Sequence, residues 1–302
     1  MGRALAETFP EAADLFERSS AILGGRFLDV VFSAEAEELR DTRVTQPAVF
    51  LVSTAAAEAL RSLGVNPSGA AGHSLGEYSA LVASGVLAFE DGLRIVQERA
   101  RLMSECAARS KGAMAAILGM PLEELEALVA ETGRTCPVEI ANINSPEQVV
   151  VSGEETSVEK FSAIALEKGA KKAVKLKVSG AFHSALMSPV SDELARLFEQ
   201  YRFSPPRVPF VSNVTADFVR EPGEIKRLLA EQVRRPVLWN ASMNRFIDSG
   251  SSLFVEVGPG RVLKGLMRRI NSSGARVFSA GEPDALRKSA QEILELQRQS
   301  VS

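Results

Sequence analysis

The order of predicted strands and helices between residues 112 and 178 constrains the fold of this chain more than any other feature. Short apolar runs and helical periodicities follow one another there as strand, helix, strand, strand, helix and strand, at 113–118, 122–131, 138–143, 148–151, 158–168 and 172–178. A turn containing Asn144-Ser145-Pro146 joins the two central strands. This order is that of a ferredoxin-like βαββαβ unit, and we predict a small domain of this kind over 111–180.

The flanking segments show a second alternation of strands and helices. Apolar residues at helical spacing run from Pro47 to Leu63, and Gly64 ends that helix. The other predicted elements are strands at 69–72, 209–212 and 253–257 and helices at 75–83, 90–108, 185–201 and 262–270. This pattern is typical of the α/β class. We predict a large α/β-hydrolase-like domain with a parallel core sheet over 1–110 and 181–302, into which the small domain is inserted.

Composition and charge exclude several functions. The 302 residues are 45% hydrophobic, enough for a large core, and the net charge of -3 gives no general attraction to nucleic acid. No apolar stretch reaches the roughly 18 residues of a membrane span, and the N-terminus lacks the apolar core of a signal peptide. Only Cys106 and Cys136 are cysteines, which predicts no disulfide framework and fits a reducing cytoplasm.

The segment Gly72-His73-Ser74-Leu75-Gly76 matches the pattern G-x-S-x-G. In this pattern the serine occupies a sharp turn between a strand and a helix, and the glycines allow the backbone to pass closely. The following helix directs its free N–H groups at the turn. We therefore predict Ser74 as a nucleophile and the Leu75 N–H as an oxyanion donor. A purely structural Gly-Ser turn is the alternative.

A serine hydroxyl needs a base in order to attack at neutral pH. The chain has two histidines, and His73 is poorly placed because neighbouring side chains diverge. His183, at the junction of the small domain with the returning helix, is the remaining candidate. The alternative is a histidine at a helix N-terminus without a chemical role. No Asp or Glu stands out as a third member of a triad.

The segment from Gly72 to Leu81, read as GHSLGEYSAL, resembles the active-site signature of malonyl-CoA:acyl-carrier-protein transacylases. The Phe182-His183 pair and the VEVGPG run from Val255 to Gly260 resemble that family too, in the same order and at suitable spacings. The resemblance covers nearly the whole chain, and the inserted ferredoxin-like domain agrees with it.

The resemblance implies the catalytic roles. Ser74 would carry the acyl group, and His183 would act as general base and then as general acid. The third element in this family is the backbone carbonyl of a glutamine, and the matching residue is Gln232. A carbonyl that accepts the imidazole N–H fixes the tautomer without supplying a full charge, which would explain why no triad carboxylate is found.

The resemblance also implies an arginine that binds the malonyl carboxylate, and the match falls on Arg99. A guanidinium binds a carboxylate through two parallel hydrogen bonds. Arg94 and Arg101 are neighbouring candidates, and a solvated helix charge is the alternative for each of the three. Leu75 and Phe182 resemble the residues of malonyl-selective members.

Substrates and partners follow from the same resemblance. Asn142 and Asn144 match positions near the pantetheine arm, with turn-forming asparagines as the alternative. The expected substrates are malonyl-CoA and the phosphopantetheine thiol of an acyl carrier protein, without a metal or redox cofactor, and we expect a monomer. Since carrier proteins are acidic, basic side chains could form the docking surface, unless they are ordinary solvated charges: Lys171, Lys172, Lys264, Arg268 and Arg269.

The chain departs from the family pattern at its start. The family begins with a core strand and a Gly-Gln-Gly-Ser-Gln loop, whose first glutamine supplies a second oxyanion N–H, and neither is found here. We expect either a start codon set too late or a weakened enzyme, because one lost oxyanion donor typically costs about 10²–10³ in rate.

Three other functions stay open from the sequence. A serine esterase or thioesterase shares G-x-S-x-G, although it would not need the segment around Arg99. An inactive, N-terminally truncated form could still bind a carrier protein. A trans-acting malonyl loading acyltransferase of polyketide synthesis would have the same site as an enzyme of fatty acid synthesis.

Overall fold

The structure is a computed structural model. It describes residues 1–33, 41–270 and 274–299. Contacts divide the chain into two compact units. The first unit comprises Met1–Ala100, Phe203–Phe210 and Phe246–Ser302, and the second comprises Arg101–Arg202 and Val211–Arg245. This division by contacts does not follow the predicted domain boundaries. The predicted large domain over 1–110 and 181–302, with a small domain inserted over 111–180, stays a prediction.

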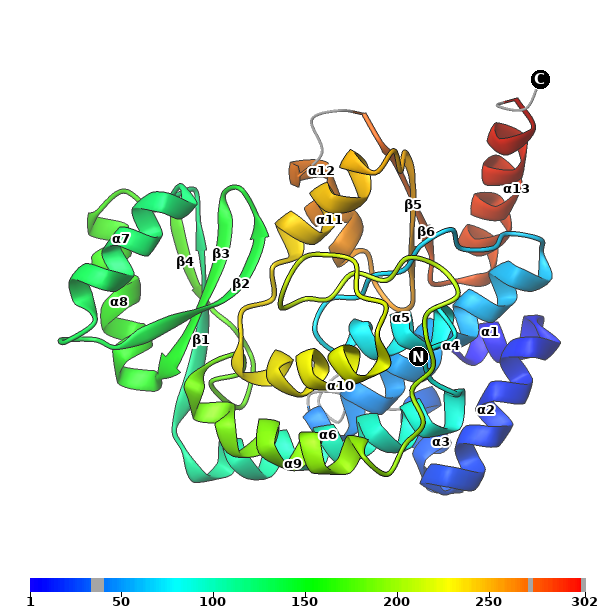
Figure 1. Ribbon diagram of the computed structural model, residues 1–302, viewed down its shortest axis with the longest axis horizontal. Helices are drawn as coiled ribbons and strands as arrows, with labels where there is room; N and C mark the ends of the chain where they lie inside the picture. Colours follow the sequence, from blue (N-terminus) through cyan, green and yellow to red (C-terminus); the bar gives the residue numbers. More distant parts are fainter. Residues whose placement is uncertain (34–40, 271–273, 300–302) are drawn as a thin grey trace. The chain divides into compact units, whose positions relative to one another are not determined.

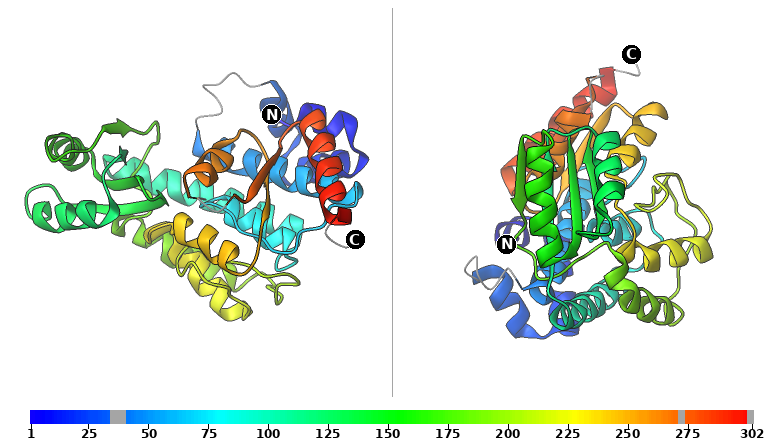
Figure 2. Two further views of the ribbon diagram at one scale, coloured as in Figure 1. Left: turned by 90° about the horizontal axis from the view of Figure 1, so that it is seen from above. Right: turned by 90° about the vertical axis from the view of Figure 1, so that its left-hand side faces the viewer.

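The second unit contains a four-stranded antiparallel sheet in the order β2-β3-β1-β4. The elements follow the chain as β1 (Gly112–Leu118), α7 (Leu122–Thr132), β2 (Val138–Ser145), β3 (Gln148–Glu154), α8 (Glu155–Glu167) and β4 (Lys172–Lys175). Both helices lie on one face of the sheet (Figure 1, Figure 2). The predicted βαββαβ order is confirmed.

The core of this unit is apolar, and β1, one of the two central strands, is buried on both faces. All five residues from Ala113 to Ile117 of β1 are buried. The helices contribute Leu125 and Phe161, each 0% exposed. Burying a side chain such as Phe161 stabilises the fold by about 1.5–3 kcal/mol.

Three strand ends in this unit differ from the predicted ones, and one of them is that of β3, which continues to Glu154 instead of Val151. β2 continues through Asn144 and Ser145, which the sequence assigned to a turn, and the turn begins at Pro146. Proline has no N–H for the ladder, so the strand ends before it. The last strand, β4, ends at Lys175 instead of residue 178, although the Leu176 N–H still donates to the Met114 carbonyl of β1 at 2.9 Å.

Short helices complete the second unit. They are the last part of α6 (Phe89–Arg109), η2 (Ala185–Met187), α9 (Ser188–Phe198), α10 (Pro222–Glu231), η3 (Gln232–Arg234) and the first part of α11 (Trp239–Asp248). The helix predicted over 185–201 is thus a 3₁₀ turn followed by a shorter α-helix with Pro189 in its first turn. The segment after η3 joins the edge of β2 through a parallel bridge between Asn142 and Val237.

The first unit is mainly helical. Its helices are α1 (Arg3–Thr8), α2 (Pro10–Leu23), α3 (Gly25–Ser33), α4 (Thr42–Ser62), α5 (Gly76–Ala83), the first part of α6 (Phe89–Arg109), α12 (Val262–Ile270) and α13 (Pro283–Gln299). α4 contacts α2, α5 and α13 and buries Phe50 and Leu51 completely. It begins before the predicted Pro47, because the Asp41 side chain caps it by accepting the Arg43 N–H at 2.9 Å.

The α/β class is confirmed, but the parallel sheet of the first unit is shorter than predicted. β5 (Leu253–Val257) and β6 (Arg276–Ala280) pair in parallel. The predicted strands at 69–72 and 209–212 contribute a single parallel bridge between Ala70 and Phe210. At Gly72 the chain already passes against the backbone of Gly76, so the ladder cannot extend that far.

A carboxylate fixes the junction between β5 and α12. Both oxygens of Glu256 accept N–H groups from the start of α12, from Leu263 at 2.9 Å and from Lys264 at 2.8 Å. These bonds satisfy two of the N–H groups that a helix N-terminus leaves free. The φ of 103° at Gly258, in the connecting loop, strongly favours glycine.

Candidate active site

Ser74 lies on a tight turn between the bridge at Ala70 and the start of α5. Its φ of 50° is in the left-handed region, which costs a non-glycine residue about 1–2 kcal/mol. The turn is closed by the Gly76 N–H, which donates to the His73 carbonyl at 2.9 Å. The Glu77 N–H donates to the Ser74 carbonyl at 3.1 Å. Ser74 therefore occupies the strained turn that G-x-S-x-G predicts.

The turn should not tolerate a side chain at Gly72. A Cβ there would lie 1.9 Å from the carbonyl carbon of Gly76, which belongs to the backbone of α5. We expect Gly72→Ala to displace Ser74 and to slow its labelling by a fluorophosphonate about 100-fold, the usual effect of a misplacement near 1 Å. Gly223→Ala, where a Cβ would meet nothing within 4 Å, is the control. Unchanged labelling of Gly72→Ala would contradict this account of the turn.

The Leu75 N–H lies at the N-cap position of α5. The three following N–H groups donate within the turn, the Tyr78 N–H to the Leu75 carbonyl at 3.1 Å. The Leu75 N–H takes no part in these bonds and lies where the helix dipole is positive. Its position fits an oxyanion donor, and that role stays a prediction.

Arg99 of α6 lies beside the Ser74 hydroxyl. Its Nη2 donates to Ser74 Oγ at 3.2 Å. Arg99 is buried, with only 1% of its surface exposed. The two neighbouring candidates lie on the surface: Arg101 pairs with Glu105 at 2.6 Å, and Arg94 lies 3.6 Å from Asp91. Among the three, the structure therefore places Arg99 beside the predicted nucleophile, Ser74.

Burial shapes the electrostatics around Arg99. Removal from water lowers the pKa of the Arg99 guanidinium, while Tyr78 and Glu77 act in the opposite direction. The guanidinium carbon lies 5.5 Å from the centre of the Tyr78 ring, and burial raises the pKa of the Tyr78 hydroxyl. An arginine stays charged in proteins, so the site presents a cation in a dry environment beside Ser74 Oγ.

Sequence reasoning missed Gln46 of α4. The Oε1 of Gln46 accepts a hydrogen bond from Arg99 Nη1, and the residue is 6% exposed. The only signal in the sequence is a glutamine in a helix whose neighbours are mostly apolar, which indicates a buried polar group that needs a partner.

His183 and Gln232 meet in the second unit. The His183 Nδ1 lies 2.8 Å from the Gln232 carbonyl oxygen, and the His183 backbone N–H donates to the Val233 carbonyl at 2.9 Å. Because a carbonyl only accepts, Nδ1 carries the proton in the neutral ring and Nε2 is left with a lone pair. The structure thus places both predicted residues together, in the arrangement that the resemblance implied.

The predicted substrate-binding residues of the second unit are also buried. Phe182 precedes His183 and is 9% exposed. Asn142 and Asn144 are 6% and 7% exposed and lie on β2, not in a turn. Their roles toward a substrate stay predictions.

The backbone marks Ser74 and His183 independently of any motif. In the described ranges, positive φ values outside glycine occur at Ser74, His183 and Ala216. Such strain persists only where the surrounding structure enforces it, and it clusters at functional sites. Ser74 belongs to the first unit and His183 to the second.

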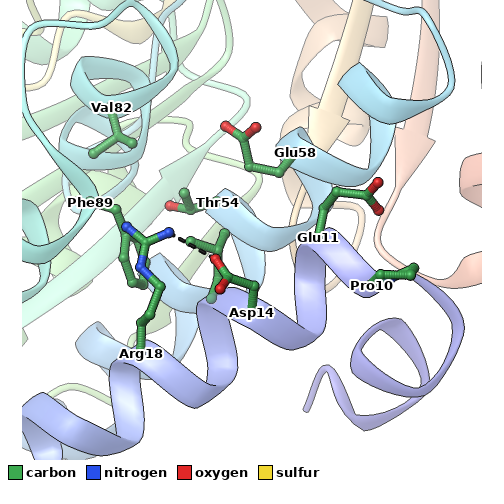
Figure 3. A pocket seen from close by; sticks show the side chains of 9 residues that line it. Pro10, Glu11, Asp14, Arg18, Thr54, Glu58, Val82 and Phe89 are labelled. Atoms are coloured by element: carbon green, nitrogen blue, oxygen red, sulfur yellow. Dashed lines mark hydrogen bonds and ion pairs between the residues drawn. The ribbon is translucent and has the colours of Figure 1, made fainter.

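A separate groove of about 590 Å³ lies in the first unit (Figure 3). Its lining residues are Pro10, Glu11, Asp14, Leu15, Arg18, Thr54, Glu58, Val82 and Phe89. The Arg18 guanidinium is held there by Asp14 at 2.8 Å and by Glu90. Since neither Ser74 nor Arg99 lines it, the groove is distinct from the predicted site.

Three further observations concern the part of the chain that the structure describes. None of its helices is both long enough and apolar enough to cross a membrane. No three of its His, Cys, Asp and Glu side chains are grouped so that they could hold a metal ion. Cys106 and Cys136 are free thiols, and Cys136 is buried.

Known proteins are similar to this chain in sequence and in fold. A family model described as an acyl transferase domain matches residues 1–293. The malonyl CoA-acyl carrier protein transacylase of Bacillus subtilis is 40% identical over 298 residues, which cover 98% of this chain and 93% of that protein. The solved structure of a malonyl CoA-acyl carrier protein transacylase from Clostridium perfringens has a TM-score of 0.94 at 34% identity, and the match covers 100% of this chain and 95% of that one.

A further solved structure contains a malonyl-transacylase in complex with a holo type II PKS acyl-carrier protein. It has a TM-score of 0.92 at 35% identity, and the match covers 97% of this chain and 94% of that chain. The chain therefore belongs to the acyl transferase family. The relatives described above are all malonyl transacylases, so the resemblance stated from the sequence is confirmed.

Proposed function

We propose that this protein transfers a malonyl group from coenzyme A to the phosphopantetheine thiol of an acyl carrier protein in fatty acid synthesis. The observation that carries the proposal is the 3.2 Å hydrogen bond between Arg99 Nη2 and Ser74 Oγ. A buried guanidinium beside a nucleophile favours an acyl group that ends in a carboxylate. The names of the relatives support the same reaction.

The reaction would proceed in two half-reactions through an ester on Ser74. Ser74 Oγ attacks the thioester carbonyl carbon of malonyl-CoA while His183 takes the hydroxyl proton. The oxyanion is stabilised by the Leu75 N–H, and the C–S bond breaks as His183 returns the proton to the leaving thiolate. The thiol of the carrier protein then attacks the ester carbonyl, His183 accepts the thiol proton, and Ser74 regains it.

The contact between His183 and Gln232 suits the proton transfers that His183 would carry out. The Gln232 carbonyl, 2.8 Å from Nδ1, holds the proton on that nitrogen and leaves Nε2 as the basic atom. When the ring becomes protonated, the same carbonyl stabilises the imidazolium as a dipole. We propose further that Phe182 limits the size of the acyl group and that Asn142 and Asn144 hydrogen-bond the pantetheine arm.

The steps above need proton transfer and acyl exchange only. We therefore propose that the protein works without a metal or redox cofactor. We also propose that it is a cytoplasmic monomer. Dialysis against a chelator should leave transfer unchanged, and size-exclusion chromatography with light scattering would measure the mass in solution.

Intact mass spectrometry tests the proposed function directly. The protein is incubated briefly with malonyl-CoA, and a holo acyl carrier protein is then added. A malonyl adduct that moves to the carrier supports the proposal. An adduct that water removes at the same rate without carrier would favour a thioesterase, and the absence of an adduct would favour an inactive form.

A second candidate is a malonyl loading acyltransferase acting in trans in polyketide synthesis. The observation that favours this candidate is a solved structure of a relative in complex with a type II PKS acyl-carrier protein. The values of kcat/KM for carrier proteins of fatty acid and polyketide synthesis, measured side by side, separate the two candidates.

The basic face of α12, formed by Lys264, Arg268 and Arg269, is our proposed docking surface for the acidic carrier protein. Lys171 and Lys172 of the second unit are further candidates, although Lys171 lies 3.8 Å from Glu147. These basic side chains would attract an acidic partner.

Reversing charge on α12 should therefore weaken docking. We expect Arg268→Glu with Arg269→Glu to raise the KM for the carrier protein about threefold to tenfold, most strongly at low salt. Acylation by malonyl-CoA should not change. Arg298→Glu, on the exposed last turn of α13, is the control. An unchanged KM would reject this surface.

A further inference from the structure

A chain of hydrogen bonds leads from the start of α4 to the nucleophile. Arg99 Nη2 donates to Ser74 Oγ at 3.2 Å, and Arg99 Nη1 donates to Gln46 Oε1. Gln46 Nε2 in turn donates to Thr42 Oγ1 at 2.9 Å. We call Thr42 and Gln46 the α4 relay.

The two ends of the Gln46 amide are not interchangeable. The amide oxygen accepts and the amide nitrogen donates, whereas a guanidinium only donates. If the amide were turned over, two donors would face each other at Arg99. The donor-only guanidinium of Arg99 therefore selects the orientation that presents Oε1, and the Thr42 hydroxyl anchors the other end of the amide by accepting from Nε2.

The backbone of α4 keeps the relay in register. Thr42 and Gln46 are four residues apart, so their side chains lie on the same face of the helix. The Asp41 side chain fixes the first turn by accepting the Arg43 N–H at 2.9 Å. Gln46 and Arg99 are 6% and 1% exposed, and hydrogen bonds are stronger where water is excluded.

We propose that Thr42 and Gln46 are positioning residues that set the preference for a carboxylated acyl group. They hold the Arg99 guanidinium in the rotamer that directs Nη2 to Ser74, so that the cation is in place before the malonyl ester forms. Preorganisation of this kind strengthens binding because less side-chain freedom is lost when the ligand arrives. The inference rests on the proposed function, in which Arg99 binds the malonyl carboxylate.

The test is the ratio of kcat/KM for malonyl-CoA to that for acetyl-CoA. In Gln46→Leu we expect this ratio to fall about tenfold, mainly through the KM for malonyl-CoA, since a tenfold change corresponds to about 1.4 kcal/mol, within reach of one hydrogen bond to a charged group. Thr42→Val should lower the ratio by a smaller factor, about twofold, because the amide loses the hydrogen bond that anchors its other end. Thr42→Ser, which keeps the hydroxyl, should restore it. Gln97→Leu, at an exposed position of α6, is the matched control.

Each outcome bears on the inference. An equal fall for both acyl groups, or an unchanged ratio in Gln46→Leu, would overturn the relay as a determinant of specificity. If Gln46→Leu fails to fold, Gln46→Glu keeps the shape and should lower the same ratio, because its carboxylate would occupy Arg99. A wild-type protein that forms no malonyl adduct would instead reject the proposed function, and the relay with it.

Discussion

Replacing Ser74 with alanine should abolish the malonyl adduct that the wild-type protein forms with malonyl-CoA. The Ser74 hydroxyl lies on the strained turn before α5 and within 3.2 Å of Arg99 Nη2. Removing the nucleophile of a serine enzyme can cost about 10⁶ in rate. Intact mass after incubation with malonyl-CoA, together with transfer to a holo carrier protein, measures the loss.

The control for this change is Ser62→Ala at the end of α4, where the hydroxyl bonds only to the Ala59 carbonyl at 3.0 Å. This variant should form the adduct at the wild-type rate. An adduct that persists in Ser74→Ala would locate the nucleophile elsewhere, and peptide mapping would identify it.

The second large effect is expected from Arg99→Ala. The kcat/KM for malonyl-CoA should fall about 10²–10³-fold, because loss of a buried charged partner typically costs 2–5 kcal/mol. The kcat/KM for acetyl-CoA should fall less than about tenfold, since acetyl has no carboxylate to pair. The two rates are measured as transfer to a holo carrier protein, with circular dichroism to show that the variant is folded.

Arg101→Ala is the matched control, because Arg101 lies on the same helix but is exposed and pairs with Glu105 at 2.6 Å. Its acyl preference should stay that of the wild type. Arg99→Lys keeps the charge but loses the planar fork, so an intermediate preference is expected. If Arg99→Ala slowed both acyl groups equally, Arg99 would support the fold of the site instead of selecting malonyl.

The parts of the fold that were predictable have local signals. The βαββαβ order follows from short apolar runs and helical periodicities, each readable within a few residues. The turn at Ser74 follows from Gly72, whose missing side chain leaves room for the backbone of Gly76. In both places, neighbouring residues suffice to specify the backbone.

The parts that could not be predicted depend on distant residues. Gln46 and Arg99 are 53 residues apart, and nothing near either residue indicates the contact. The Gln232 carbonyl is a backbone group that every residue has, so only the family resemblance indicated it. The short parallel pairing at Ala70 depends equally on a distant partner, Phe210.

At Ser74 and His183 the left-handed backbone favours glycine, whereas the proposed reaction requires a hydroxyl and an imidazole. With φ values of 50° and 58°, both residues adopt a conformation that glycine reaches without steric cost. A lineage released from acyl transfer would relieve about 1–2 kcal/mol of strain at each position by drifting to glycine. Keeping serine and histidine at positions where the backbone favours glycine is thus expected only as long as the proposed acyl transfer is retained.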